Sequence, residues 1–204
     1  ASFDQNKTIY LTIIIISSLY IILFIWCRYM DLIVDRSKAK IRLLEDNNID
    51  DFYFYEIIFF TGNRFNAGTD SIVYFNISGS IADSGYRKVN CTNEELKGKV
   101  FQRASIDSFL MTSQSSLGSL NYLRICHDNS GKGSKESWFL KFVIIHDLQT
   151  REKFYFICNK WFALDKEDGL IDRVIPVAAS KQKTELKYLT EKQTKNKLSD
   201  GHIW

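Results

Sequence analysis

The sequence predicts a mainly β protein, an antiparallel sandwich or barrel, with one transmembrane helix before it and a basic linker after it. Three observations lead to this prediction. Residues 9–26 carry no charged residue, Gly or Pro. From Tyr53 onwards, short segments rich in aromatic and β-branched residues alternate with turns of Gly, Asn, Asp and Ser, and no helical run separates them. With 45% hydrophobic and 14% aromatic residues, the chain has the composition of a folded protein.

The apolar segment near the N-terminus is long enough for a membrane span. Its 18 residues, 9–26, rise almost across a hydrocarbon core of about 30 Å when they are helical, and Cys27 can extend them. A buried core helix is one alternative. A signal peptide is another, but it would have a shorter apolar region and a small-residue cleavage site. We therefore predict an extracellular flank at residues 1–8 and a transmembrane helix at residues 9–27.

The distribution of Lys and Arg predicts the orientation of this span. Only Lys7 precedes it, whereas five basic residues follow within residues 28–42. Because cytoplasmic flanks are enriched in Lys and Arg, residues 28–52 are predicted to be a cytoplasmic stalk, and the β domain behind them is also cytoplasmic. An odd number of cysteines lies beyond the span, which fits reduced thiols in the cytosol: Cys91, Cys126 and Cys158.

Eight strands are predicted in the β region, and two four-stranded sheets would accommodate them. They are residues 53–61, 71–78, 85–90, 98–101, 106–113, 120–127, 138–147 and 151–158. After Pro176, the only proline, lysines punctuate a segment with little apolar content. Residues 178–204 are therefore predicted to be a solvated basic linker or a basic amphipathic helix near a membrane.

No pattern in the sequence supports catalysis. The Gly-x-Ser-x-Gly elbow is absent, and "GKGSK" at residues 131–135 lacks the spacing of a phosphate-binding loop. The three histidines, His127, His146 and His202, lie far apart without metal-ligand spacing. We predict neither an enzyme nor a nucleic-acid partner.

Two polar loops, at residues 62–70 and 127–138, are candidates for a calcium site. Calcium takes six to eight oxygen ligands, and flexible loops supply both carboxylates and backbone carbonyls. Alternatively, Asp and Asn in these turns cap their own backbone. The candidate ligands are the Asp70 carboxylate, the carbonyls of Asn66, Ala67 and Gly68, and oxygens of Asp128, Asn129 and Glu136.

Several motifs in order resemble a PLAT domain over residues 53–177. They are "TGNRFNAGTDSIVYFNISG", "FQRASIDSFLM", "LGSLNYLRICHDNSG", "SWFLKFVIIHD" and "FYFICNKWF". This resemblance implies an eight-stranded PLAT-type β-sandwich like those of lipoxygenases, some lipases and polycystins. The span directly before the domain resembles the polycystin-one-like receptor-channel branch, in which the domain forms the first intracellular loop. Residues 178–204 would then lead to the next span.

The resemblance also implies a role for the opening turn. In calcium-binding PLAT domains the Ala-Gly-Thr-Asp turn helps form the site, and here it maps onto residues 67–70. Ser71 stands where lipoxygenase-like members often carry a second acid, so we expect calcium to be held weakly.

Loop tips at one end of the domain are implied to face the membrane. Phe65 and Trp161 are then candidates for insertion, although Trp161 could equally pack in the core. Five basic residues are candidates for contact with anionic headgroups: Arg64, Lys132, Lys135, Lys160 and Lys166. Ser105, in "RAS", matches a basophilic kinase pattern.

The leading hypothesis is a non-enzymatic, membrane-tethered module that binds anionic lipids or protein partners. Two alternatives stay open: the regulatory domain of a lipase- or lipoxygenase-like enzyme, and a purely protein-binding adaptor.

Overall fold

The computed structural model describes residues 7–38, 41–89 and 100–179, and the chain divides into two compact units, residues 1–40 and 41–204. The first unit contains one described helix, α1 (Lys7–Lys38). Within α1, the stretch Tyr10–Tyr29 is long and apolar enough to cross a membrane, and none of it is buried in the protein. This candidate span overlaps the transmembrane helix predicted at residues 9–27.

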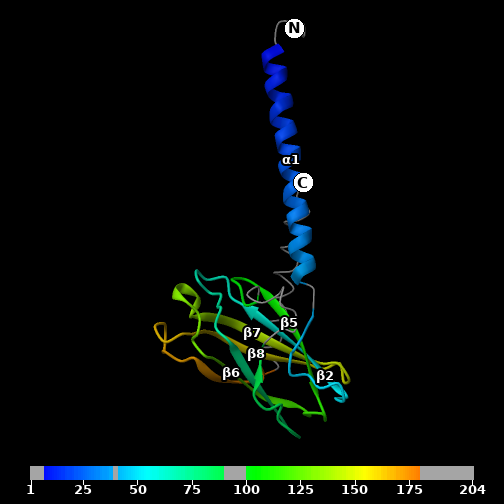
Figure 1. Ribbon diagram of the computed structural model, residues 1–204, viewed down its shortest axis with the longest axis vertical. Coiled ribbons are helices and arrows are strands. Elements are labelled where there is room, and N and C mark those ends of the chain that lie inside the picture. Colours follow the sequence, from blue (N-terminus) through cyan, green and yellow to red (C-terminus); the bar gives the residue numbers. More distant parts are fainter. Residues whose placement is uncertain (1–6, 39–40, 90–99, 180–204) are drawn as a thin grey trace. The chain divides into compact units, whose positions relative to one another are not determined.

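The second unit is a β-sandwich of two sheets (Figure 1). One sheet has the strand order β1-β5-β2-β7-β8, and the other has the order β4-β3-β6-β9. All neighbouring strands run antiparallel except β1 and β5, which are parallel. The strands of the described chain are β1 (Arg42–Leu43), β2 (Tyr53–Thr61), β3 (Val73–Gly79), β4 (Arg87–Lys88), β5 (Ile106–Ser113), β6 (Leu120–His127), β7 (Trp138–Asp147), β8 (Lys153–Phe162) and β9 (Asp172–Pro176).

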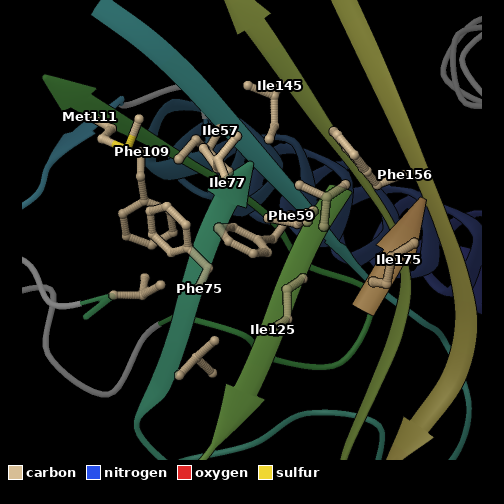
Figure 2. Close-up of a cluster of buried hydrophobic side chains, with 14 of the residues drawn as sticks. Ile57, Phe59, Phe75, Ile77, Phe109, Met111, Ile125, Ile145, Phe156 and Ile175 are labelled. Atoms are coloured by element: carbon tan, nitrogen blue, oxygen red, sulfur yellow. The ribbon is translucent and has the colours of Figure 1, made fainter. Parts of the chain in front are cut away.

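The core lies between the sheets and is built by the two-residue alternation of the strands. In β2, Tyr55, Ile57 and Phe59 are fully buried, and the residues between them are only partly so. Phe75 and Ile77 of β3 face them from the second sheet, as Figure 2 shows. Burial of each such side chain contributes about 1.5–3 kcal/mol.

Aromatic rings fill the end of the core nearest the β2–β3 loop. The Phe59 ring centroid lies 5.4 Å from that of Phe101, 5.9 Å from that of Phe109 and 6.2 Å from those of Phe75 and Trp138. The three Phe–Phe contacts are edge-to-face, the arrangement that the ring quadrupole favours.

The sandwich class is confirmed, but the strands differ from the eight predicted. The predicted strand at residues 98–101 is wrong where the structure describes it, because Val100 and Phe101 lie in a bend. Phe101 has a positive φ of 53° while its ring packs in the core, so its aromatic character reflects burial and not a strand. Residues 98 and 99 lie outside the described part of the chain.

Two strands were missed, so the described sandwich has nine strands in sheets of five and four. The β1 strand has only two residues, too few to show a period. The β9 strand ends in Pro176, and proline within a run argues against a strand unless it lies on an edge. Here β9 is an edge strand, paired only with β6 in its sheet.

The β unit begins before the expected boundary at residue 53. Arg42 and Leu44, placed in the stalk by the sequence analysis, are both buried in the sandwich. The Asn47 side chain donates to the Leu110 carbonyl and accepts from the Thr112 N–H, so it pairs with β5 much as a strand would. The segment that follows α1 is thus an integral part of the sandwich. Of the predicted linker at residues 178–204, only Ala178 and Ala179 lie within the described part.

Candidate functional site at one end of the sandwich

Four loops gather at one end of the sandwich, here termed the loop end. They are residues 62–72, 100–105, 128–137 and 163–171. The antiparallel pairing explains why they meet, since β2, β6 and β8 finish at this end while β3, β5, β7 and β9 start there. Every site residue predicted from the sequence lies in these loops or beside them.

The first and third loops are bound to each other through Thr69, Asp70 and Ser71. The Lys135 carbonyl accepts hydrogen bonds from the Thr69 hydroxyl (2.8 Å) and the Asp70 N–H (3.1 Å). The Ser71 hydroxyl donates to the Glu136 carbonyl (3.2 Å) and accepts from the Gly131 N–H (3.0 Å). The two loops therefore lie next to each other, as the predicted calcium site requires.

Gly68 brings the second loop, residues 100–105, against the first and third loops. A Cβ at Gly68 would lie 2.8 Å from both the Arg103 nitrogen and the Phe101 carbonyl oxygen, closer than real Cβ atoms approach backbone. The Thr69 N–H donates to that same Phe101 carbonyl (3.0 Å). The Ala-Gly-Thr-Asp turn thus has a structural reason for its glycine, which is close backbone approach.

The Asp128 carboxylate caps backbone N–H groups through one of its two oxygens. Its Oδ1 accepts from the Ile72 and Ser130 N–H groups, each at 3.0 Å. Desolvation alone would raise the pKa of Asp128, but hydrogen bonds from Ser130 and Ile72 together lower it below its ordinary value. Asp128 behaves as the turn-capping alternative predicted.

The Asp70 carboxylate has a cation of the protein's own beside it. Lys135 Nζ lies 3.6 Å from Asp70 Oδ1, and it also donates to Gln102 Oε1 at 2.9 Å. Both members of the Lys135–Asp70 pair are partly exposed, so the pair itself contributes little to stability.

The residues as arranged do not form a calcium cage. Within the described residues no group of three or more His, Cys, Asp or Glu side chains is placed to hold a metal ion. The Ala67 carbonyl accepts from the Phe139 N–H (2.9 Å), and the Glu136 carbonyl accepts from the Ser71 hydroxyl (3.2 Å). Asn66 has a positive φ of 55°, as expected in a turn, and the Glu136 side chain is exposed. The arrangement uses much of the predicted donor set for internal hydrogen bonds.

A second cluster, made of small and aromatic residues, supports the other side of the first loop. It contains Ala67, Phe139, Trp161 and Ala163. The Phe139 and Trp161 ring centroids lie 5.3 Å apart. Arg64 covers the Phe139 ring at 4.0 Å, and the Lys166 ammonium covers the Trp161 ring at 4.2 Å.

Trp161 is therefore placed differently from the insertion role predicted for it. Its exposure is only 8%, because its ring packs on Phe139 and lies beneath Lys166. The core alternative holds for this residue. Lys166 also donates to the Ser137 hydroxyl (2.8 Å), which ties the fourth loop to the third.

Glu167 connects two of the predicted basic residues. Arg64 Nη1 lies 3.3 Å from its Oε1, Lys160 Nζ lies 3.9 Å from its Oε2, and that Oε2 also accepts from the Trp161 N–H at 3.2 Å. The Arg64 and Lys160 side chains are each about half exposed. Both cations therefore remain accessible from solvent despite their shared partner.

Apolar side chains project from two of these loops. Phe65, a predicted candidate for membrane insertion, is 80% exposed. Leu164 (62%) and Leu170 (50%) are exposed on the fourth loop, and sequence reasoning missed both. The available signal was the presence of two leucines in the otherwise polar run "LDKEDGL". Lys132, at the tip of the third loop, is also exposed.

His127 and Ser105, which also lie near the loop end, have structural partners. His127 is buried, with Nδ1 accepting from the Asn129 N–H and Nε2 3.0 Å from the Phe162 carbonyl. Burial lowers the pKa of His127, which favours the neutral ring. The Ser105 hydroxyl donates to Asp107 Oδ2 at 2.6 Å.

The two-sheet sandwich with this loop arrangement matches a known domain class. The PLAT/LH2 domain model matches residues 55–175, and the chain belongs to that family.

Its curated relatives include polycystin-family proteins. Human polycystin-1-like protein 3 is 32% identical over 91% of this chain, and the human polycystin family receptor for egg jelly is 29% identical over 100% of it. The chain spans about a tenth of the length of these relatives, since it covers 10% of the first and 9% of the second. Both names place these relatives among the polycystin-like proteins, and the second describes a receptor.

Solved structures show the same fold. A crystal structure of a LOX in complex with arachidonate superposes with a TM-score of 0.50 and 22% identity, covering 62% of this chain and 17% of that one. The coral 8R-lipoxygenase, described as activated by calcium through a C2-like domain, has a TM-score of 0.50 and 22% identity over 61% of this chain and 17% of its own. At this identity the likeness is one of fold.

Proposed function

We propose that this chain is a non-enzymatic, membrane-tethered PLAT module whose loop end binds a lipid surface containing anionic headgroups. The observation that carries the proposal is the exposed Phe65 tip next to the half-exposed Arg64, with Leu164 and Leu170 on a loop joined to it by the Arg64–Glu167 pair. An apolar tip beside a cation suits the membrane interface, where the ring enters the acyl boundary and the cation meets phosphate.

The charge balance of the loop end indicates short-range binding. Together with Lys160 it has six basic side chains (Arg64, Arg103, Lys132, Lys135, Lys160 and Lys166) and six acidic ones (Asp70, Asp128, Glu136, Asp165, Glu167 and Asp168). Long-range attraction to an anionic surface is therefore weak. Affinity would come from the apolar tips, and the preference for anionic lipid from the cations next to them.

Some of the acidic groups are already engaged by other partners, and the two cations that share Glu167 stay about half exposed, so they can still meet headgroups. Arg173 pairs with Asp168 and lowers the pKa of that carboxyl to about 2. Asp128 is held by backbone N–H groups, and Glu167 by Arg64 and Lys160. The tether adds to a weak contact, because it raises the effective concentration of the domain near the membrane.

Vesicle co-sedimentation of residues 41–179 tests this proposal. That fragment contains the whole described β unit and omits the lysine-rich residues 180–204, which would bind anionic vesicles by charge alone. We expect more binding to vesicles of phosphatidylserine and phosphatidylcholine than to phosphatidylcholine alone. Phe65→Ala should weaken binding by about tenfold, since an inserted phenylalanine contributes about 1.5–3 kcal/mol when fully buried.

The chain offers a matched control for the apolar substitution and another for the charge reversal. Phe52 is 78% exposed and precedes β2 at the opposite end of the sandwich, so Phe52→Ala should leave binding unchanged. Arg64→Glu should remove the preference for phosphatidylserine, whereas Lys153→Glu, at the far end of β8, should keep it. Equal binding to neutral and anionic vesicles, or no binding to either, would contradict the proposal and leave the protein-binding adaptor in its place.

A further inference from the structure

We infer that Lys135 takes the place of a divalent cation at Asp70, so that the loop end is assembled without calcium and its response to calcium is set by this lysine. The inference concerns the regulation of the loop end to which the proposed function assigns membrane binding, and it rests on that assignment only for its biological meaning. The calcium response of the loop end can be measured with no anionic lipid present.

The Lys135 ammonium bridges three loops, which is the role a bound cation would have. It lies 3.6 Å from Asp70 Oδ1 in the first loop and donates to Gln102 Oε1 at 2.9 Å in the second, while its own backbone belongs to the third. One carboxylate and one amide oxygen are ligand types that calcium also takes.

The backbone of the third loop fixes the lysine in this place. Lys135 ends the short 3-10 turn Gly133–Lys135, and its carbonyl holds both Thr69 and Asp70. A Cβ at Gly131 would lie 2.1 Å from the Lys135 carbonyl oxygen, and Gly133 has a φ of +58°. The run "GKGSK", which lacks the spacing of a phosphate-binding loop, thus builds the turn that presents Lys135 to Asp70.

Ser71, directly after Asp70, joins the first and third loops through a neutral side chain. Its hydroxyl is buried and carries hydrogen bonds in both directions, to Glu136 and from Gly131. A neutral side chain therefore joins the two loops without any need for a metal. Asp70 is left with a single negative charge, which one ammonium group balances.

Removing the lysine charge should uncover affinity for calcium. A unit charge and a divalent ion about 4 Å apart repel each other appreciably even in a high dielectric, enough to change binding by about tenfold. Lys135→Met removes the charge and keeps most of the side-chain length, and Lys135→Gln is a second neutral variant. Lys135→Arg retains the charge.

The experiment uses the full chain, residues 1–204, in nanodiscs of phosphatidylcholine, where calcium cannot bridge to anionic lipid. Thermal unfolding followed by tryptophan fluorescence is recorded against calcium and, separately, against magnesium as a control for ionic strength. A ligand that binds only the folded state raises the melting temperature. We expect Lys135→Met and Lys135→Gln to respond to calcium at about tenfold lower concentration than the wild type and Lys135→Arg.

Two further variants make the result specific. Adding Asp70→Asn to Lys135→Met should abolish the gain, and Lys153→Met, at the opposite end of the sandwich, should behave as the wild type. An equal calcium response in the wild type and Lys135→Met would overturn the inference, and so would the absence of any response in folded Lys135→Met. If Lys135→Met gains calcium binding while the domain shows no preference for anionic vesicles, the proposed membrane binding is contradicted and the inference about Lys135 still holds.

Discussion

The Arg42 guanidinium lies 3.0 Å from the Asp107 carboxylate in an ion pair whose side chains are both almost completely buried. The pair joins the segment directly after α1 to β5, within the only parallel strand pairing of the described sandwich. Asp107 also accepts from the Phe101 N–H and the Ser105 hydroxyl through its other oxygen. The contact makes the segment that follows α1 in the sequence part of the folded domain.

Breaking this pair should destabilise the sandwich strongly. Asp107→Asn leaves Arg42 buried without its counter-charge, and the loss of one partner of a buried pair costs about 3–5 kcal/mol. Urea unfolding of residues 41–179 would measure the change. The exposed Arg124–Asp172 pair is the control, and Asp172→Asn should cost no more than about 1 kcal/mol. Comparable small losses in both variants would show that the Arg42–Asp107 contact is not a structural anchor.

Truncation gives an independent measurement of the same contact. A fragment that starts at Tyr53 lacks β1, the buried Leu44 and the Asn47 contacts with β5. It should be markedly less stable in urea than the fragment that starts at Ile41. Equal stability of the two fragments would return residues 41–52 to the role of a simple stalk.

Acid should weaken the loop end through His127. The folded state holds the ring neutral, so the pKa of His127 lies below its ordinary value of 6.5, whereas the unfolded chain keeps the ordinary value. The stabilisation is therefore complete above about pH 6.5 and is lost as the pH falls through the lower folded pKa. The charge of Asp128 tends to raise the pKa of His127, and Asp128 stays ionised in that range because its own pKa is lowered.

Melting temperatures between pH 7.5 and pH 5 measure this effect on residues 41–179. His127→Gln should flatten the pH dependence, because the variant has no group at that position to protonate. His146→Gln is the control, since His146 lies partly exposed on β7, near Glu56. If His127→Gln keeps the full pH dependence of the wild type, the stability loss comes from other groups.

The distribution of Lys and Arg predicts the orientation of the span. The fold does not test this prediction. In cells that express the full chain, the β unit should resist external protease until the membrane is permeabilised. The sequons at Asn76 and Asn90 provide a second readout, because a cytoplasmic domain receives no glycans. Glycosylation at either position would show that the β unit is not cytoplasmic and would contradict the predicted orientation.

Much of the fold follows from local patterns, and the errors have physical causes. The long strands β2, β5 and β7 show clear aromatic and β-branched runs, and their predicted ranges coincide with the observed ones. The strand predicted at residues 98–101 failed because apolar character alone does not distinguish a strand from a core-packing bend such as that of Phe101. The β1 strand could not be predicted, because its two residues are held by a partner more than sixty positions away.

The candidate site was predictable in location but not in detail. Turn composition and the family resemblance indicated both loops, and their contact through Asp70 and Lys135 is observed. The sequence could not show that Lys135 points at Asp70, since this depends on the geometry of a turn in another loop. Nor could it show that Trp161 lies under Lys166, because the alternation that buries it requires the register of β8 against β7.

The most direct test of membrane binding by the loop end is hydrogen–deuterium exchange on the full chain in nanodiscs. Exchange of peptides covering residues 62–66 and 163–170 is compared between discs of phosphatidylserine with phosphatidylcholine and discs of phosphatidylcholine alone. We predict slower exchange in both peptides with phosphatidylserine, no change in the opposite-end turn at residues 148–152, and loss of the slowing in Phe65→Ala. Identical exchange in the two kinds of disc, or slowing confined to residues 148–152, would contradict the assignment of the loop end as the membrane-binding surface.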